Sequence, residues 1–143
     1  MTTCGAGGLR LLGVLTLPGV KRSVRHARVF LVVTLVPEHL AAGGDLLDDM
    51  TLVVDEFAAN GIRHTASGRG GKIHIALWAG KGVLRAEVSD DGAGGARPVL
   101  RDADDESGRG LHIVEALAVR WGHHADGPRT TVWAEFVARG GEG

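Results

Sequence analysis

The stretch LVVDEFAANGIRHT, residues 52–65, decides the fold because it has the pattern of an amphipathic helix. Its apolar residues and those just before it recur at helical spacing and form a broad stripe: Leu46, Leu47, Met50, Val53, Val54, Phe57, Ala58, Gly61 and Ile62. Glu56 and Asn60 stand four residues apart, so a helix places them one above the other at the margin of that stripe. We therefore predict a helix, running to about His64, that carries a carboxylate and a carboxamide on one face. Taken alone, such a pair is more typical of a solvated helix edge than of a functional site.

Length, charge and cysteine content limit the classes of protein to consider. We expect the 143 residues to form one domain, which is large enough to bury a core without disulfides. The 16 Lys and Arg residues nearly balance the 17 Asp and Glu residues, so no basic field argues for direct binding to nucleic acid or to a membrane surface. The single cysteine, Cys4, excludes an internal disulfide framework and fits a reducing compartment, so we expect a cytoplasmic protein. No apolar run approaches the ~20 residues of a membrane-spanning helix.

The remaining elements follow from periodicity and from Gly and Pro breaks. We predict a strand at 9–17, a helix from about 23 to 35, a hairpin of strands 72–79 and 83–90, a helix at 109–121, and strands at 121–125 and 130–138. Residues 1–8 and 139–143 are expected to be disordered tails. This order predicts an α+β two-layer sandwich, with helices on one face of a mixed but mostly antiparallel sheet.

Asp90 stands at the end of a predicted strand. The three alternate residues before it share one apolar face, and Asp90 has the same parity, so its carboxylate is expected to point toward the core. A buried carboxylate is costly unless it finds hydrogen-bond donors, and the amino group of adenine is a suitable donor. Gly92 and Gly94 follow and lack side chains that would block a flat base. Taken alone, Asp-x-Gly-x-Gly is more typical of a simple turn at Asp91-Gly92.

Residues 91–107 form a polar, glycine-rich segment that contains the acidic run DADDE at 102–106. A loop of that length without regular pattern is typical of a functional segment such as a lid over an active site. Directly after it, Gly108-Arg109-Gly110-Leu111 opens an apolar helix. Helix N-termini present unpaired N–H groups, and glycine permits close approach, so this start is suited to bind phosphate. The same glycines are also typical of a hinge before a helix.

Together, Glu-x-x-x-Asn, Asp-x-Gly-x-Gly and Gly-x-Gly resemble the nucleotide site of the GHKL, or Bergerat-fold, ATPases in their order and in their placement on helix, strand end and helix start. The resemblance implies ATP and Mg²⁺ as cofactors, with Glu56 as the catalytic residue that polarises the nucleophile, Asn60 as the magnesium ligand and Asp90 as the adenine-binding residue. It also implies a base site lined by Gly92 and Gly94, with the phosphates held at Gly108, Arg109, Gly110 and Leu111 beneath an ATP lid at 91–107. Mg²⁺ takes oxygen ligands and few protein contacts, which suits a single carboxamide.

Within that superfamily, VVDEFAANGIRHT, SGRGLHIVEALAVRWG and TTVWAEF are similar to the small ATP-binding proteins akin to the anti-sigma-factor serine kinases of Gram-positive bacteria, over residues 14–138. This resemblance implies a serine/threonine-protein kinase that phosphorylates an antagonist protein and binds a sigma factor. It also implies that Thr131, in the last strand, lies near the phosphates. Gly61 departs from the family, whose members usually carry Ala there, and Gly is the poorer helix former by about 1 kcal/mol.

Other functions stay open at this point. In one, the protein is a nucleotide-gated binding module, in which ATP or ADP orders the lid and sets affinity for a partner without useful catalysis. In another, it is a detached histidine-kinase-like ATPase domain, which would need a partner with a phospho-accepting histidine. The last strand, TTVWAEF, fits the anti-sigma group better. By analogy alone, two copies could form a homodimer through the sheet or the first helix.

Overall fold

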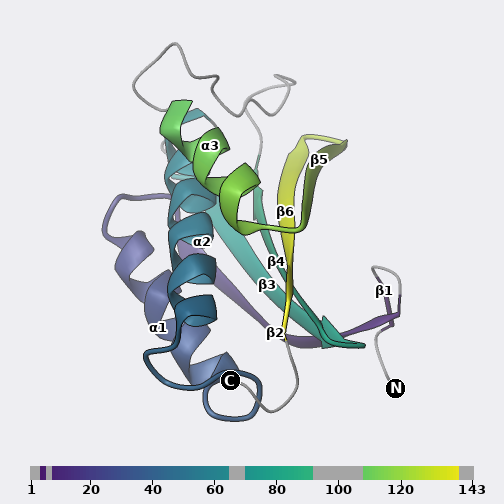
Figure 1. Cartoon of the computed structure of the whole chain (residues 1–143). Coiled ribbons are helices and arrows are strands. Elements are labelled where there is room, and N and C mark those ends of the chain that lie inside the picture. Colours follow the sequence, from purple (N-terminus) through teal and green to yellow (C-terminus); the bar gives the residue numbers. More distant parts are fainter. Residues whose placement is uncertain (1–3, 6–7, 65–69, 92–107, 139–143) are drawn as a thin grey trace.

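The computed structural model describes residues 4–5, 8–64, 70–91 and 108–138 (Figure 1). Along the chain the elements are β1 (Cys4–Gly5), β2 (Leu9–Pro18), α1 (Ser23–Leu35), α2 (Asp45–His64), β3 (Lys72–Gly80), β4 (Val83–Asp90), α3 (Gly108–Leu117), β5 (Arg120–Asp126) and β6 (Arg129–Val137). The six strands form one sheet in the order β1-β2-β3-β4-β6-β5, and each neighbouring pair is antiparallel. The predicted α+β class and the predicted helices on one face are confirmed.

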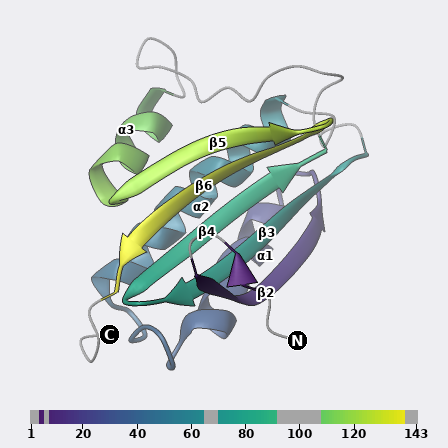
Figure 2. The same cartoon turned by 90° about the vertical axis from the view of Figure 1, so that its right-hand side faces the viewer.

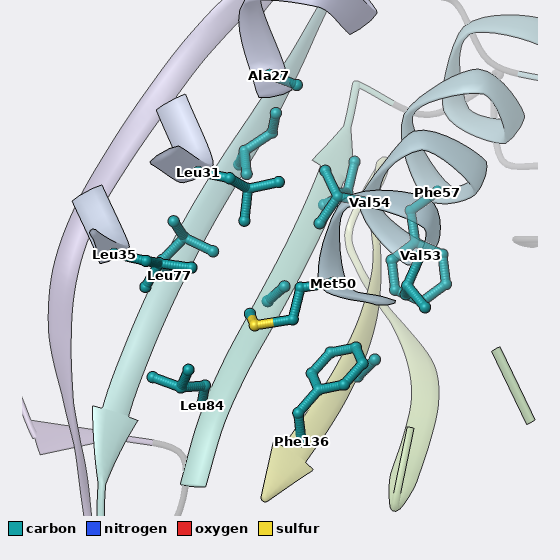
Figure 3. Packing of buried hydrophobic residues seen from close by; sticks show 14 of the residues in the cluster. Ala27, Leu31, Leu35, Met50, Val53, Val54, Phe57, Leu77, Leu84 and Phe136 are labelled. Atoms are coloured by element: carbon teal, nitrogen blue, oxygen red, sulfur yellow. The ribbon is translucent and has the colours of Figure 1, made fainter. Parts of the chain in front are cut away.

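The core lies between the sheet and the two longer helices. Figure 2 looks at the sheet from the side that faces away from α1 and α2, and α3 packs against α2 (Figure 1). The predicted stripe of α2 is buried, with Met50, Val53, Val54 and Phe57 at most 1% exposed, and Figure 3 shows these side chains in one cluster with Phe136 of β6. Burial of such side chains contributes about 1.5–3 kcal/mol each, so this stripe fixes α2 on the sheet.

The hairpin between β3 and β4 sets the register that positions the end of β4. Its turn places Lys81 at φ 54° and Gly82 at φ 75°, the pair of positive φ angles that a two-residue hairpin turn of this twist requires. From this turn the pairing runs without a shift to Ile73 opposite Asp90. On the other side of β4, Asp90 lies opposite Thr130 of β6. The hairpin fixes the position of Asp90, and the pairing of β4 with β6 brings Asp90 and Thr130 together at one end of the sheet.

Alternation divides β4 and β6 between two faces. Even-numbered residues of both strands face the helices and make part of the core, as the buried Ala86, Val88, Val132 and Ala134 show. The opposite face, here called the outer face, carries the odd-numbered residues: Arg85, Glu87, Ser89, Thr131, Trp133 and Glu135. On the outer face the guanidinium of Arg85 lies 4.1 Å from the ring centre of Trp133, a cation–π contact.

Two expectations need correction. Cys4 and Gly5 are not part of a disordered tail, because they form β1 and pair with Arg10 and Leu9 of β2. The predicted helix at 109–121 ends at Leu117, since the chain crosses to the sheet there and the Val119 N–H donates to the Glu135 carbonyl at 2.9 Å. Residues 1–3 and 139–143 lie outside the described residues. Among the helices that the structure describes, none is long and apolar enough to span a membrane.

Candidate functional site

The C-terminal half of α2 presents Glu56 and Asn60 near the end of the sheet. The two residues lie one helical turn apart, as their spacing predicts. Asn60 is 8% exposed, whereas Glu56 is half-buried at the margin of the core. The side chain of Glu56 makes no hydrogen bond or ion pair with another residue that the structure describes. A carboxylate and a carboxamide therefore stand in line on α2, with the carboxylate closer to solvent.

Asp90 is a carboxylate buried at the end of β4. It is 4% exposed and shares the helix face of the strand with the apolar residues before it, as alternation predicts. Burial of a charged carboxylate is costly unless donors compensate it. Thr130 of β6 supplies one, since its hydroxyl donates to Asp90 Oδ1 at 2.8 Å. The local sequence and the antiparallel register thus combine to hold an acceptor group at this point.

The second oxygen of Asp90 faces α2. A Cβ placed at Gly61 would lie 3.4 Å from Asp90 Oδ2 and 3.7 Å from Ile73 Cγ2. Gly61 directly follows Asn60, so the end of β4 and the Asn60 turn of α2 are in contact. The structure therefore brings Asn60 and Asp90 together, although they are 30 positions apart in the chain.

The start of α3 lies at the same end of the molecule. In Figure 1 the end of α2, the end of β4 and the first turn of α3 are all at the upper end, and in Figure 2 α3 lies at the left whereas β4 ends at the right. The helix α2 contacts both α3 and β4. The helix α3 begins at Gly108, one residue before the predicted start at Arg109, and Leu111 in its first turn is half-buried. The first four N–H groups of an α-helix have no partner within the helix, and the helix dipole favours an anion there. Gly92, Gly94 and the rest of the predicted lid at 92–107 lie outside the described residues, as does the side chain of Arg109.

Thr131 is not part of this group. Its side chain lies on the outer face, where its hydroxyl is 2.8 Å from the hydroxyl of Ser89, its partner in β4. The threonine on the helix face is Thr130, which the sequence reasoning missed. Alternation could have identified it, because Thr130 shares parity with the buried Val132 and Ala134.

A second polar group lies on the outer face directly behind Asp90. Asp91 accepts a hydrogen bond from the Lys72 backbone N–H at 2.7 Å, and its Oδ1 is 3.4 Å from His74 Nε2. The Lys72 N–H is the main reason that the pKa of Asp91 lies below its ordinary value, and His74 and Arg129 lower it further. This group was also missed by sequence reasoning, which treated Asp91 as part of a turn. It ties the start of β3 to the residue after Asp90.

Comparisons with known proteins agree with the fold. The family model of the histidine kinase-like ATPase domain matches residues 18–136. Among solved structures, the chain is similar to the crystal structure of the RsbU and RsbW domains of Rv1364c from Mycobacterium tuberculosis, with a TM-score of 0.57 and 23% sequence identity. That likeness shows the fold; it covers 87% of this chain and 32% of the other, so this chain spans about a third of that protein. No curated protein matches the sequence.

Proposed function

The chain belongs to the family of histidine kinase-like ATPase domains, and from that premise we propose that it binds ATP at the end of the molecule that carries the last turn of α2, the end of β4 and the start of α3. The observation that carries this proposal is the placement of Asp90. A carboxylate that is 4% exposed, held by a threonine hydroxyl and in contact with α2, is an acceptor suited to the exocyclic amino group of adenine.

The neighbouring groups fit the rest of Mg-ATP. Asn60 offers a carboxamide oxygen, which is a hard ligand of the kind that Mg²⁺ takes, and Mg²⁺ when bound would neutralise charge on the phosphates. The first turn of α3 offers backbone N–H groups to the same phosphates. Because α2 and α3 pack together, these groups are fixed relative to one another by the core rather than by loops. Thr130 would orient Asp90 toward the base.

We further propose that the chain transfers the γ-phosphoryl group to a serine or threonine of a protein antagonist and that it binds a sigma factor. This narrower proposal is supported by the resemblance of its sequence to anti-sigma-factor serine kinases. In the proposed transfer, the substrate hydroxyl oxygen forms a bond to the γ-phosphorus, and the bond from that phosphorus to the β–γ bridging oxygen breaks. ADP leaves with the electron pair, and Glu56 accepts the hydroxyl proton. The half-buried position of Glu56, one turn from Asn60, suits such a base.

The test compares two carboxylates on the same helix. Glu56→Gln removes the proposed base and keeps its shape, whereas Asp55→Asn changes a residue whose partner is Arg28 of α1, at 2.8 Å. With γ-labelled ATP and candidate antagonist proteins, we expect Glu56→Gln to lower phosphoryl transfer at least about 100-fold. Asp55→Asn should keep transfer within about twofold, because it removes an exposed pair remote from the reacting groups.

The outcomes separate the steps of the proposal. Transfer by Glu56→Gln at the wild-type rate would contradict the assignment of Glu56 as the base. ATP binding by the wild-type protein without transfer to any candidate would instead favour a nucleotide-gated binding module. Failure of ATP to raise the thermal stability of the wild-type protein, with and without Mg²⁺, would contradict nucleotide binding itself, since a specific ligand must stabilise the state that binds it.

A further inference from the structure

Gly61 stands in the helix α2, where glycine is a poor choice for stability. A glycine within a helix loses more conformational freedom than alanine does and packs no side chain. Several other glycines that the structure describes have a conformational or steric reason. Gly82 has a φ of 75°, which side chains rarely adopt, and a Cβ at Gly122 would lie 2.8 Å from Trp133 Cζ2. Gly61 has neither constraint: its φ is not positive, and a Cβ there would make ordinary contacts at 3.4 Å and longer with the described residues.

The contacts of that absent Cβ show what the glycine leaves room for. Two of the three nearest atoms belong to Asp90, with Oδ2 at 3.4 Å and Cβ at 3.7 Å, and the third is Ile73 Cγ2 at 3.7 Å. An N–H donor bound to Asp90 Oδ2 would have its nitrogen about 2.9 Å from that oxygen. The donor nitrogen and a methyl group at position 61 would therefore both contact this one oxygen atom. A substituent on the nitrogen and a side chain at position 61 would compete for the same space.

We infer that Gly61 is a specificity-determining residue, which widens the base end of the site so that adenine nucleotides with one small alkyl group on the exocyclic amine are accepted. The inference rests on the proposed ATP binding through Asp90. A monoalkylated amine keeps one N–H to donate to Asp90, and its methyl group fills the space at Gly61. A dialkylated amine has no N–H, so it would leave the buried carboxylate without that donor, which is costly.

The test measures the dissociation constants of ATP and N6-methyl-ATP for the wild-type protein and for Gly61→Ala, by isothermal titration with Mg²⁺. The readout is the ratio of the two constants within each protein, which cancels any general change in nucleotide affinity. We expect a ratio within about threefold for the wild type and an increase of at least about tenfold for Gly61→Ala, since one methyl group too many in a filled site is penalised by that amount. N6,N6-dimethyl-ATP should bind both proteins weakly.

A second variant distinguishes the effect of the added methyl group at position 61 from the effect of a less flexible helix. Ala59→Gly in the Gly61→Ala background restores a glycine to the same turn of α2 while keeping the methyl group at position 61. We expect this double variant to discriminate against N6-methyl-ATP as Gly61→Ala does. Wild-type behaviour of the double variant would overturn the inference, because flexibility of the helix would then decide the ratio. Equal ratios for the wild type and Gly61→Ala would also overturn it, while binding of ATP to both proteins would leave the proposed function standing. Absence of ATP binding would overturn both.

Discussion

Two carboxylates in the paired strands β4 and β6 are buried to nearly the same degree, but they have different hydrogen-bonding partners. Glu135 is 3% exposed and Asp90 is 4% exposed. Glu135 lies on the outer face, where Arg85 donates to it at 2.8 Å and Arg120 forms a second ion pair. Asp90 lies on the helix face, where a neutral threonine hydroxyl donates to one oxygen and α2 approaches the other.

The difference separates a carboxylate that serves the fold from one suited to a ligand. Burial alone would raise the pKa of Glu135, but the hydrogen bonds and charges of Arg85 and Arg120 outweigh burial, so the pKa of Glu135 lies below its ordinary value. Its charge is thus neutralised by groups that the chain itself supplies. Asp90 stands at a strand end, beside the glycine of a helix, where we propose that a donor from a nucleotide binds it. Substitutions at the two positions should therefore have different consequences.

The largest effect is expected for Asp90→Asn, measured as affinity for ATP. The variant replaces a charged acceptor by an amide whose N–H₂ group can face the N–H₂ group of adenine, so the dissociation constant should rise about 100-fold. Isothermal titration with Mg-ATP measures the change. The matched control is Glu135→Gln, measured under conditions where it is folded, and it should bind ATP with the affinity of the wild type. Retention of wild-type affinity by Asp90→Asn would remove the distinction between the two carboxylates.

Next in size is the loss of stability in Glu135→Gln. The side chain of Arg85 is 11% exposed, so its guanidinium would remain largely buried with half of its charge compensation, which Glu87 still provides at 2.8 Å. We expect the free energy of unfolding in urea to fall by about 2 kcal/mol. Arg120→Ala removes the other partner, whose side chain is 71% exposed, and should cost less than about 1 kcal/mol. An equal decrease in the free energy of unfolding in the two variants would mean that burial of Arg85 does not determine how much stability is lost.

A smaller effect is expected at Thr130 and Thr131, two adjacent residues of β6 that lie on opposite faces of the sheet. Thr130→Val removes the hydroxyl that donates to Asp90, and it should weaken ATP binding about tenfold, the free energy of one hydrogen bond to a charged group. Thr131→Val removes the contact with Ser89 on the outer face and should lower stability by up to about 1 kcal/mol without changing ATP affinity. The reverse result would restore Thr131, the residue that family resemblance assigned, to the nucleotide site.

The pair Thr130 and Thr131 also shows what the sequence could and could not predict. The burial of α2 and the inward direction of Asp90 were predicted correctly, because helical and strand periodicity are local properties of the chain. Which of the two adjacent threonines faces the helices follows from alternation, but its pairing with Asp90 depends on the register of β6 against β4, which brings together residues 40 positions apart. The residue type does not distinguish the two threonines, but the position of Thr130 in the alternating pattern of β6, in step with the buried Val132 and Ala134, does distinguish them.

The other differences have the same origin in long-range pairing. The helix α3 ends at Leu117, earlier than its apolar pattern predicts, because Arg120 pairs with Glu135 of β6 and the strand begins there. Likewise Cys4 and Gly5 lack any apolar pattern of their own and are ordered by their partners in β2. Such pairings carry free energy that no local window of sequence contains.

The smallest expected effect concerns Asp91, which lies on the outer face beside Asp90. The pKa of Asp91 is lowered mainly by the hydrogen bond from the Lys72 N–H. The ionised carboxylate therefore stabilises the fold fully at a pH above its ordinary pKa of 3.8, and this stabilisation is lost as the pH falls through the lower pKa of the folded state. Because its side chain is 37% exposed, solvent screens this contribution to about 0.5 kcal/mol. Urea unfolding from pH 6 to pH 2.5 should therefore show the wild type slightly more stable than Asp91→Asn at pH 6, with the gap closing in acid. A gap that widens in acid would mean that protonated Asp91 is the favoured form in the fold, and the outer face would then hold its carboxylates by burial rather than by donors.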